Sequence, residues 1–228
     1  MSSRISILDH GYLDFIESWG SDERIIETAR VSTQKGFLGW GTSEKPGDEK
    51  LLRYLYEHKH STPFEFAGLT LEIQAPIFVF REWHRHRTQS YSEASARYAP
   101  LPDLNYIPTV ERLMMNGGAN KQAGSVGVKV LTEQDARLER EDLREEYERS
   151  EYYYQRALNR GVPKELARIR LPVGRYSKMR ATANLRNWLG FLTLRQAPEA
   201  QWEIRQYALA VGEVVTAWFP RTWELFVR

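Results

Sequence analysis

The chain of 228 residues has no cysteine, and this absence excludes several kinds of chemistry. Without thiols there are no disulfides, thiolate metal sites, iron–sulfur clusters or cysteine nucleophiles. The chain also lacks an apolar run long enough to cross a bilayer, and residues 1–8 lack the long apolar core of a signal peptide. We therefore expect a cytoplasmic protein with no membrane partner.

The chain also lacks a large excess of either positive or negative residues. Lysine and arginine number 32 and aspartate and glutamate number 30, which gives a formal net charge of +2. A chain with so little net charge has no broad positive field, and we expect no nucleic-acid partner. Any binding of anions must therefore be local.

Several familiar catalytic and nucleotide-binding motifs are absent too. The glycines form no Gly-x-Ser-x-Gly elbow, dinucleotide fingerprint or phosphate loop. Two His-x-His pairs occur at 58–60 and 84–86, but Arg85 and Arg87 flank the second pair and would repel a divalent cation. We predict no metal site.

The chain does contain enough apolar material for one folded domain over 1–228, with 42% hydrophobic and 12% aromatic residues. Apolar periodicity, capping residues and breakers predict strands over 4–9 and 69–74, and helices over 21–32, 49–58, 77–84, 132–160, 183–195 and 200–218. Segments rich in glycine near 36–48 and 116–130 predict flexible loops.

The densest cluster of polar groups lies at 85–98, which we call the arginine segment. Arginine carries a permanent charge and a planar fork of donors, so Arg85, Arg87 and Arg97 together suit phosphate or carboxylate groups. The serines add hydroxyl donors, and Glu93 adds an acceptor. The pattern predicts an anion-binding segment. A solvated, salt-bridged helix surface is the alternative that it leaves open.

Two further polar features stand among apolar residues. Asn184 and Arg195 lie eleven residues apart, about three helical turns, so one continuous helix would place them on one face. That face could hold a ligand or could simply meet solvent. Arg168 also has apolar neighbours, and it needs an anionic partner if it is buried.

Together these pieces resemble the flavin-dependent thymidylate synthases, whose signature is Arg-His-Arg-x-x-Ser-x-Asn-Glu-x-Ser-x-Arg. The matching positions are Arg85, His86, Arg87, Ser90, Glu93, Ser95 and Arg97. The likeness continues through 29–32, 60–65, 75–79, 161–163, 167–168, 184–186 and 200–203, and it covers nearly the whole chain apart from the two predicted loops.

The resemblance implies a single α+β domain with a mixed or antiparallel sheet and flanking helices. It also implies a homotetramer whose sites form between subunits. Its members bind FAD, take hydride from NADPH and transfer the carbon of methylenetetrahydrofolate to C5 of a uridylate, converting dUMP to dTMP. The family needs no cysteine nucleophile, so the absence of cysteine leaves this mechanism open.

The resemblance also assigns residues. The implied nucleotide-binding residues are Glu82, Trp83, His84, Arg85, Glu93, Ala94, Ser95, Ala96, Arg97, Arg168 and Arg195. The implied flavin-binding residues are Ser32, His60, Thr62, Glu65, Arg85, His86, Arg87, Glu93, Asn184, Leu185, Arg186 and Gly190. Ser95 and Arg195 are the implied catalytic residues, and Arg195 would favour the ionised form of the uracil because a fixed cation stabilises negative charge on the ring.

Four positions depart from the family pattern. Ser92 replaces the signature asparagine, Glu82 stands where many members have glutamine, and Gly190 and Glu199 replace the usual flavin-side residues. A carboxylate at 82 could accept from a ribose 2′-hydroxyl, which predicts UMP as an alternative substrate to dUMP. Two further classes of protein stay open, namely a nucleotide-binding relative without flavin chemistry and an RNA-binding protein.

Overall fold

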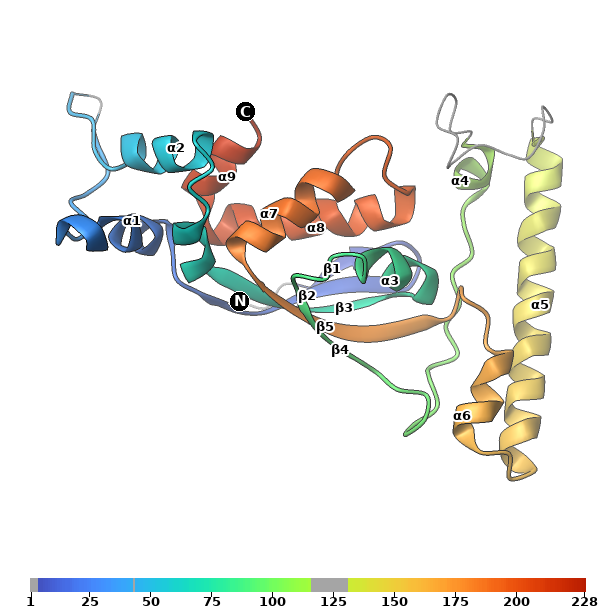
Figure 1. Ribbon diagram of the computed structural model, residues 1–228. Coiled ribbons are helices and arrows are strands. Elements are labelled where there is room, and N and C mark those ends of the chain that lie inside the picture. Colours follow the sequence, from blue (N-terminus) through green and yellow to red (C-terminus); the bar gives the residue numbers. More distant parts are fainter. Residues whose placement is uncertain (1–3, 43, 116–130) are drawn as a thin grey trace.

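A computed structural model describes residues 4–42, 44–115 and 131–228, and it shows a five-stranded antiparallel sheet with helices (Figure 1). The strands lie in the order β1-β2-β3-β5-β4. Their bounds are β1 (Ile5–Ile7), β2 (Gly11–Trp19), β3 (Gly68–Pro76), β4 (Ser90–Glu93) and β5 (Tyr176–Asn184). The α+β class with an antiparallel sheet is therefore confirmed.

Nine α-helices and three short 3-10 helices fall within the described residues. The α-helices are α1 (Asp22–Arg30), α2 (Glu49–Glu57), α3 (Ile77–Trp83), α4 (Val110–Met114), α5 (Glu133–Asn159), α6 (Lys164–Ala167), α7 (Leu185–Arg195), α8 (Trp202–Trp218) and α9 (Pro220–Phe226). The 3-10 helices are η1 (Val31–Thr33), η2 (Thr62–Phe66) and η3 (Arg168–Arg170). The described part of the chain has no helix that is long and apolar enough to span a membrane.

The central strand β3 shows how the sequence divides the sheet into two faces. Leu69, Leu71 and Ile73 are fully buried, and the residues between them point to the opposite face because side chains alternate along a strand. The helices α3, α7 and α8 lie on one side of the sheet (Figure 1). The hydrophobic core therefore lies between this face and those helices.

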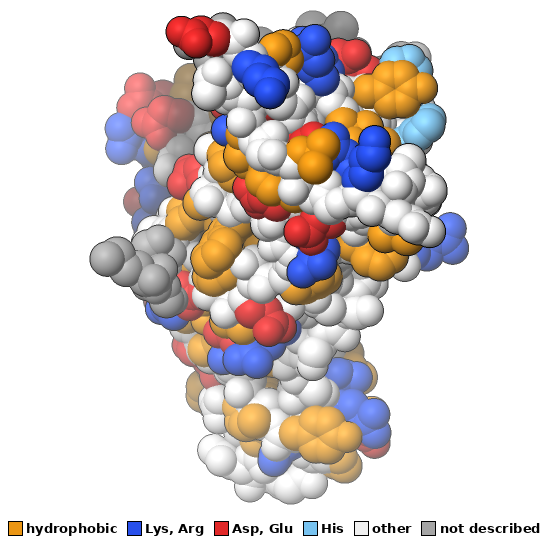
Figure 2. Space-filling model, turned by 90° about the vertical axis from the view of Figure 1, so that its left-hand side faces the viewer, with side chains coloured by type: hydrophobic (Ala, Val, Ile, Leu, Met, Phe, Trp, Pro, Cys, Tyr) orange, Lys and Arg blue, Asp and Glu red, His pale blue; other side chains and the backbone are white. Residues whose placement is uncertain are grey.

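The opposite face of the sheet carries polar side chains. Glu72 accepts hydrogen bonds from the Tyr12 hydroxyl at 3.3 Å and from Arg180 Nε at 3.2 Å. Figure 2 shows acidic and basic side chains interspersed on another part of the surface, without a large patch of one sign. This mixture agrees with the small net charge.

The long helix α5 stands at one end of the sheet (Figure 1) and is joined to it by Arg175. This arginine has no exposed side-chain surface, and it pairs with Asp103 at 2.8 Å and with Glu151 of α5. Tyr147 of α5 also donates to the Tyr106 carbonyl at 3.1 Å. Few apolar residues of α5 are buried, so these polar contacts fix where the helix lies.

The expected elements are largely present, with two corrections. The predicted helix over 183–195 begins only at Leu185, because Ala183 and Asn184 are still hydrogen-bonded in β5. The strands β2 and β5 were not predicted. In β2 a register shift between Phe15 and Glu17 breaks the alternation, and in β5 two of the buried positions hold the small residues Ala181 and Ala183.

The predicted loop at 36–48 has no helix or strand in its described residues, but Asp48 anchors it by accepting from the Leu38 amide at 2.8 Å and pairing with Arg30. Its flexibility stays a prediction. The predicted loop at 116–130 lies outside the described residues.

Candidate functional site

The helix α7 supports the first half of the arginine segment at two points. Asn184 caps the helix by accepting from the Asn187 amide at 3.0 Å. The side chain of Asn187 then donates to the carbonyl of Thr88 at 2.9 Å. Near the other end of α7, Arg195 contacts His86 and Glu82. The predicted common face of Asn184 and Arg195 therefore packs along the arginine segment instead of meeting only solvent.

Arg195 is held by three hydrogen bonds. Its Nε donates to His86 Nε2 at 2.8 Å, its Nη1 to the Glu82 carboxylate at 3.0 Å and its Nη2 to the Glu82 carbonyl at 3.0 Å. The Arg195 side chain is 16% exposed. A cation at the last residue of a helix also interacts favourably with the helix dipole. The guanidinium is thus fixed before any ligand arrives.

The contact with Arg195 sets the protonation of His86. Arginine can only donate, so His86 Nε2 must accept, and the ring proton resides on Nδ1. Burial first, and then the nearby positive charge of Arg195, lower the pKa of His86 to about 4, although Glu82 opposes the shift. His86 is consequently neutral near pH 7.

Two residues that the resemblance assigned to ligands lie in the core. Trp83 has no exposed surface, stacks on Phe191 with ring centroids 4.6 Å apart and donates to Gln89 at 3.0 Å. Leu185 is likewise fully buried. Their side chains support the site from behind, so within the described chain only their backbone groups could contact a ligand. The assignment of Trp83 and Leu185 to ligands stays a prediction.

The second half of the arginine segment lies beyond β4 and forms a turn near α6. Ala94 donates its amide to the Lys178 carbonyl at 2.8 Å, and the Ser95 hydroxyl accepts from the Arg97 amide at 3.3 Å. Arg97 Nε lies 3.3 Å from a Glu165 carboxylate oxygen. Ala96 is almost wholly buried. The alternative of a helix surface is therefore wrong, because this part of the segment is a strand followed by a turn.

Arg168 belongs to the same region. Its Nε donates to the Glu165 carbonyl at 3.3 Å, while Arg97 pairs with the Glu165 carboxylate. Arg168 is exposed, so it does not need the buried anionic partner that its apolar neighbours suggested. The structure thus gathers two of the predicted phosphate-binding arginines around one residue, Glu165.

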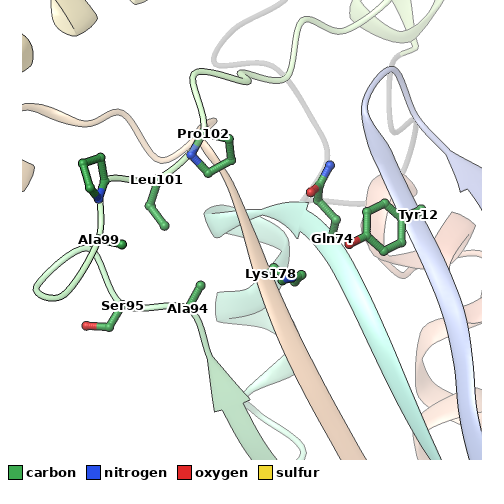
Figure 3. Close-up of a pocket in the computed structure, with 9 residues that line it drawn as sticks. Tyr12, Gln74, Ala94, Ser95, Ala99, Leu101, Pro102 and Lys178 are labelled. Carbon is green, nitrogen blue, oxygen red and sulfur yellow. The ribbon is translucent and has the colours of Figure 1, made fainter.

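A cavity of about 260 Å³ adjoins this turn (Figure 3). Its walls include Ala94 and Ser95 from the turn and Tyr12, Gln74 and Lys178 from the polar face of the sheet. In Figure 3 the Ser95 hydroxyl points away from the sheet residues. One side of the turn therefore borders the cavity, and the Ser95 hydroxyl lies on another side.

Most of the predicted flavin-side residues lie near the start of β4. Asn184 ends β5 beside Ser90, which pairs with Thr182, and Arg186 lies 2.5 Å from Glu65 of η2. Gly190 is exposed on α7, and nothing lies within 4 Å of the position that a Cβ would take.

Other predicted residues are more peripheral. Thr62 is exposed on η2, and the exposed His60 meets Tyr54 edge to face at 5.6 Å between ring centroids. Ser32, on η1, donates to the Ala29 carbonyl at 3.3 Å. The half-buried His84 faces the Met179 sulfur at 3.2 Å.

Within the described residues, no group of histidine and carboxylate side chains could hold a metal ion. Three charged side chains of the arginine segment are exposed, namely those of Arg85, Arg87 and Glu93. Within the described residues these side chains form no hydrogen bond or ion pair. The permanent charges of Arg85 and Arg87 are therefore available to an anion.

Sequence reasoning missed the residues that hold the segment in place. The Tyr91 hydroxyl donates to the His86 carbonyl at 2.7 Å, and Gln89 receives the Trp83 indole hydrogen bond. Glu165, which joins Arg97 to Arg168, was also missed. No pattern in the sequence marks such long-range contacts, although Gln89 and Tyr91 lie inside the signature itself.

Comparison with known families gives a match over most of the chain. A family model described as thymidylate synthase complementing protein matches residues 14–221. A flavin-dependent thymidylate synthase of Thermosipho africanus is 40% identical over 97% of this chain and 93% of that protein. One from Rickettsia prowazekii is 38% identical over 97% of this chain and 77% of that protein.

Solved structures agree with these sequence relatives. The UMP/dUMP methylase PolB from Streptomyces cacaoi, bound with 5-Br UMP, aligns with a TM-score of 0.81 and 32% identity over 98% of this chain and 96% of PolB. The same enzyme bound with 5-Br dUMP gives a TM-score of 0.82 and 30% identity. The chain belongs to the flavin-dependent thymidylate synthase family.

Proposed function

We propose that this enzyme methylates a uridylate at C5, converting dUMP to dTMP with methylenetetrahydrofolate as the carbon donor, NADPH as the reductant and FAD as the cofactor. The observation that carries the proposal is the arrangement of the arginine segment. It holds Arg195 against His86 and Glu82 while it leaves the charges of Arg85 and Arg87 without acidic partners in the described chain.

The residues present are suited to FAD. A pyrophosphate needs fixed cations, and Arg85 and Arg87 are exposed beside the capped start of α7. The open space at Gly190 leaves room against the helix. Asn184, Arg186 and Glu65 complete the flavin side that we propose, with Thr62 and His60 nearby. The flavin would supply the redox chemistry, and the protein would bind and orient the reactants.

The nucleotide side has a separate set of donors. Arg97 and Arg168 supply two charges for a phosphate, and Ser95 adds a hydroxyl. Arg195 supplies a fixed cation for negative charge that develops on the uracil, where a preorganised donor lowers the barrier most. Neutral His86 accepts from Arg195 and keeps it oriented.

The proposed nucleotide-binding residues lie at both ends of β4, whose four residues span roughly 13 Å. Arg85 precedes the strand and Arg195 contacts His86 at the same end, whereas Ser95, Arg97 and Arg168 lie at the other end. One chain therefore separates groups that would have to meet on one nucleotide. We propose that the active enzyme is a homotetramer in which such groups meet across subunits.

Flavin binding and nucleotide-dependent NADPH oxidation test this function. After reconstitution with FAD the protein should be yellow, and NADPH oxidation should need both the folate and a uridylate. A colourless protein, or NADPH oxidation that ignores the nucleotide, would count against the proposal. A nucleotide-binding relative without flavin chemistry would give the colourless protein.

UMP is a second candidate substrate, and one observation favours it. The Glu82 carboxylate uses one oxygen for Arg195 and is 42% exposed, so its other oxygen can accept from a ribose hydroxyl. The similar PolB is a UMP/dUMP methylase. Turnover of UMP and dUMP should be compared in the wild type and in Glu82→Gln. A strong preference for dUMP that persists in Glu82→Gln would exclude UMP as the substrate.

A further inference from the structure

The environment of Arg195 contains a negative charge that the proposed chemistry does not require. The Glu82 carboxylate lies 3.0 Å from Nη1, on the guanidinium that would face the ionised uracil. A carboxylate so placed opposes the accumulation of further negative charge at the same cation. Its presence therefore has a cost for the reaction unless it contributes something else.

Glu82 contributes by fixing the position of the Arg195 guanidinium. Arg195 has five N–H donors, and the three contacts with His86 and Glu82 use three of them. One hydrogen on Nη1 and one on Nη2 remain for a ligand. Because both terminal nitrogens are tied, these two hydrogens have fixed directions. A ligand that binds Arg195 must therefore place its acceptors along these directions.

The Glu82 carboxylate contacts Arg195 directly. His86 is neutral near pH 7 because burial and Arg195 lower its pKa, so it adds no charge. On the helix α8, which packs on α7, Tyr207 donates to the Gln74 carbonyl and Glu203 pairs with Arg112. Glu199 is exposed and lies four residues beyond Arg195, on the connection to α8.

We propose that Glu82 is a positioning residue that holds Arg195 in place and, through its charge, limits how far the enzyme ionises a bound uracil. The inference rests on the proposed function, because it assumes that the uracil lies at Arg195. Removing the charge while keeping the hydrogen bond should then favour ionisation. Removing the whole side chain should release Arg195.

The probe is 5-fluoro-dUMP, whose fluorine makes the N3–H acidic enough for its ionisation to be followed by ultraviolet absorbance. It is bound to the FAD-loaded enzyme without folate or reductant, and pH is varied. In Glu82→Gln we expect the ratio of ionised to neutral probe to rise about tenfold at a given pH, which is a decrease of about one unit in the pKa of the bound N3–H.

In Glu82→Ala the ionised fraction should fall well below that of Glu82→Gln, because Arg195 is no longer oriented. Glu133→Gln is the matched control, since it removes the same charge from an exposed pair on α5 and should change nothing. Glutamine matches the shape of Glu82, whose side chain is 42% exposed, so the fold should survive.

Three results would overturn the inference while the proposed function survives. They are equal ionisation in the wild type and Glu82→Gln, equal ionisation in Glu82→Gln and Glu82→Ala, or a larger effect from Glu199→Gln than from Glu82→Gln. A wild-type enzyme that does not bind the probe would instead contradict the proposed function itself, and the inference with it.

Discussion

At the scale of single residues, Arg195 joins the fold to the chemistry. It ends a core helix, and its guanidinium is held by one neutral acceptor and one charged acceptor. Both acceptors orient the guanidinium, but only Glu82 places a negative charge beside it. A lysine would keep the charge but lose the planar fork that makes all three contacts possible.

We therefore expect Arg195→Lys to fold normally and to lose about 100-fold in kcat, the effect typical of removing a preorganised donor. Steady-state kinetics with saturating folate and NADPH would measure the loss. Arg205→Lys is the control, because Arg205 lies on α8 and its side chain donates only to the Pro198 carbonyl among the described residues. A wild-type kcat in Arg195→Lys would exclude this role for Arg195.

His86 predicts a dependence of stability on pH. The pKa of His86 is about 4 in the folded protein and 6.5 in the unfolded chain. Between these two pH values the unfolded chain therefore binds more protons than the folded protein. Stability should fall as pH falls from 6.5 to 4, by about 1–2 kcal/mol after allowance for solvent screening.

The comparison of wild type with His86→Gln isolates this contribution, since glutamine can still accept from Arg195 but does not titrate in this range. The melting temperature of His86→Gln should decline less than that of the wild type between pH 6.5 and 4. Parallel declines in the two proteins would show that His86 is not held neutral by the fold.

At the scale of elements, the sequence predicted β3 and the long helices well, because a strict alternation or a helical period continues through each of them. The strands β2 and β5 were missed, since a register shift between Phe15 and Glu17 breaks the alternation in β2 and small alanines occupy buried positions of β5. The family signature located the arginine segment. Its division into helix end, strand and turn depends on pairing with β5, which no local pattern encodes.

The attachment of α5 depends on one buried charge. Arg175 has no exposed side-chain surface, and among the described residues Glu151→Ala should leave it with the exposed Asp103 as its one carboxylate partner. We expect the free energy of unfolding to fall by about 3 kcal/mol, as for other buried pairs that lose one partner. Chemical denaturation would measure it.

Glu148→Ala provides the control on the same helix. Glu148 is exposed, and its substitution should change the free energy of unfolding by less than about 0.5 kcal/mol. Equal effects of Glu148→Ala and Glu151→Ala would mean that Arg175 does not anchor α5.

At the scale of the whole molecule, the separation of the nucleotide-side arginines by β4 is the main reason to expect assembly. Arg97 and Arg168 lie at one end of the strand and Arg195 at the other, and a site between subunits would let such groups from different chains meet on one nucleotide. Sedimentation equilibrium should give four times the chain mass of 26.7 kDa. A stable, fully active monomer would contradict the proposal that sites form between subunits.

The mass of the nucleotide product shows directly whether the enzyme methylates a uridylate. Purified protein is incubated with FAD, NADPH, methylenetetrahydrofolate and either dUMP or UMP, and the nucleotides are then weighed by mass spectrometry. We predict that dUMP gains one methyl group, and that this gain disappears in Arg195→Ala. Unchanged masses for both nucleotides, with FAD bound, would contradict the account.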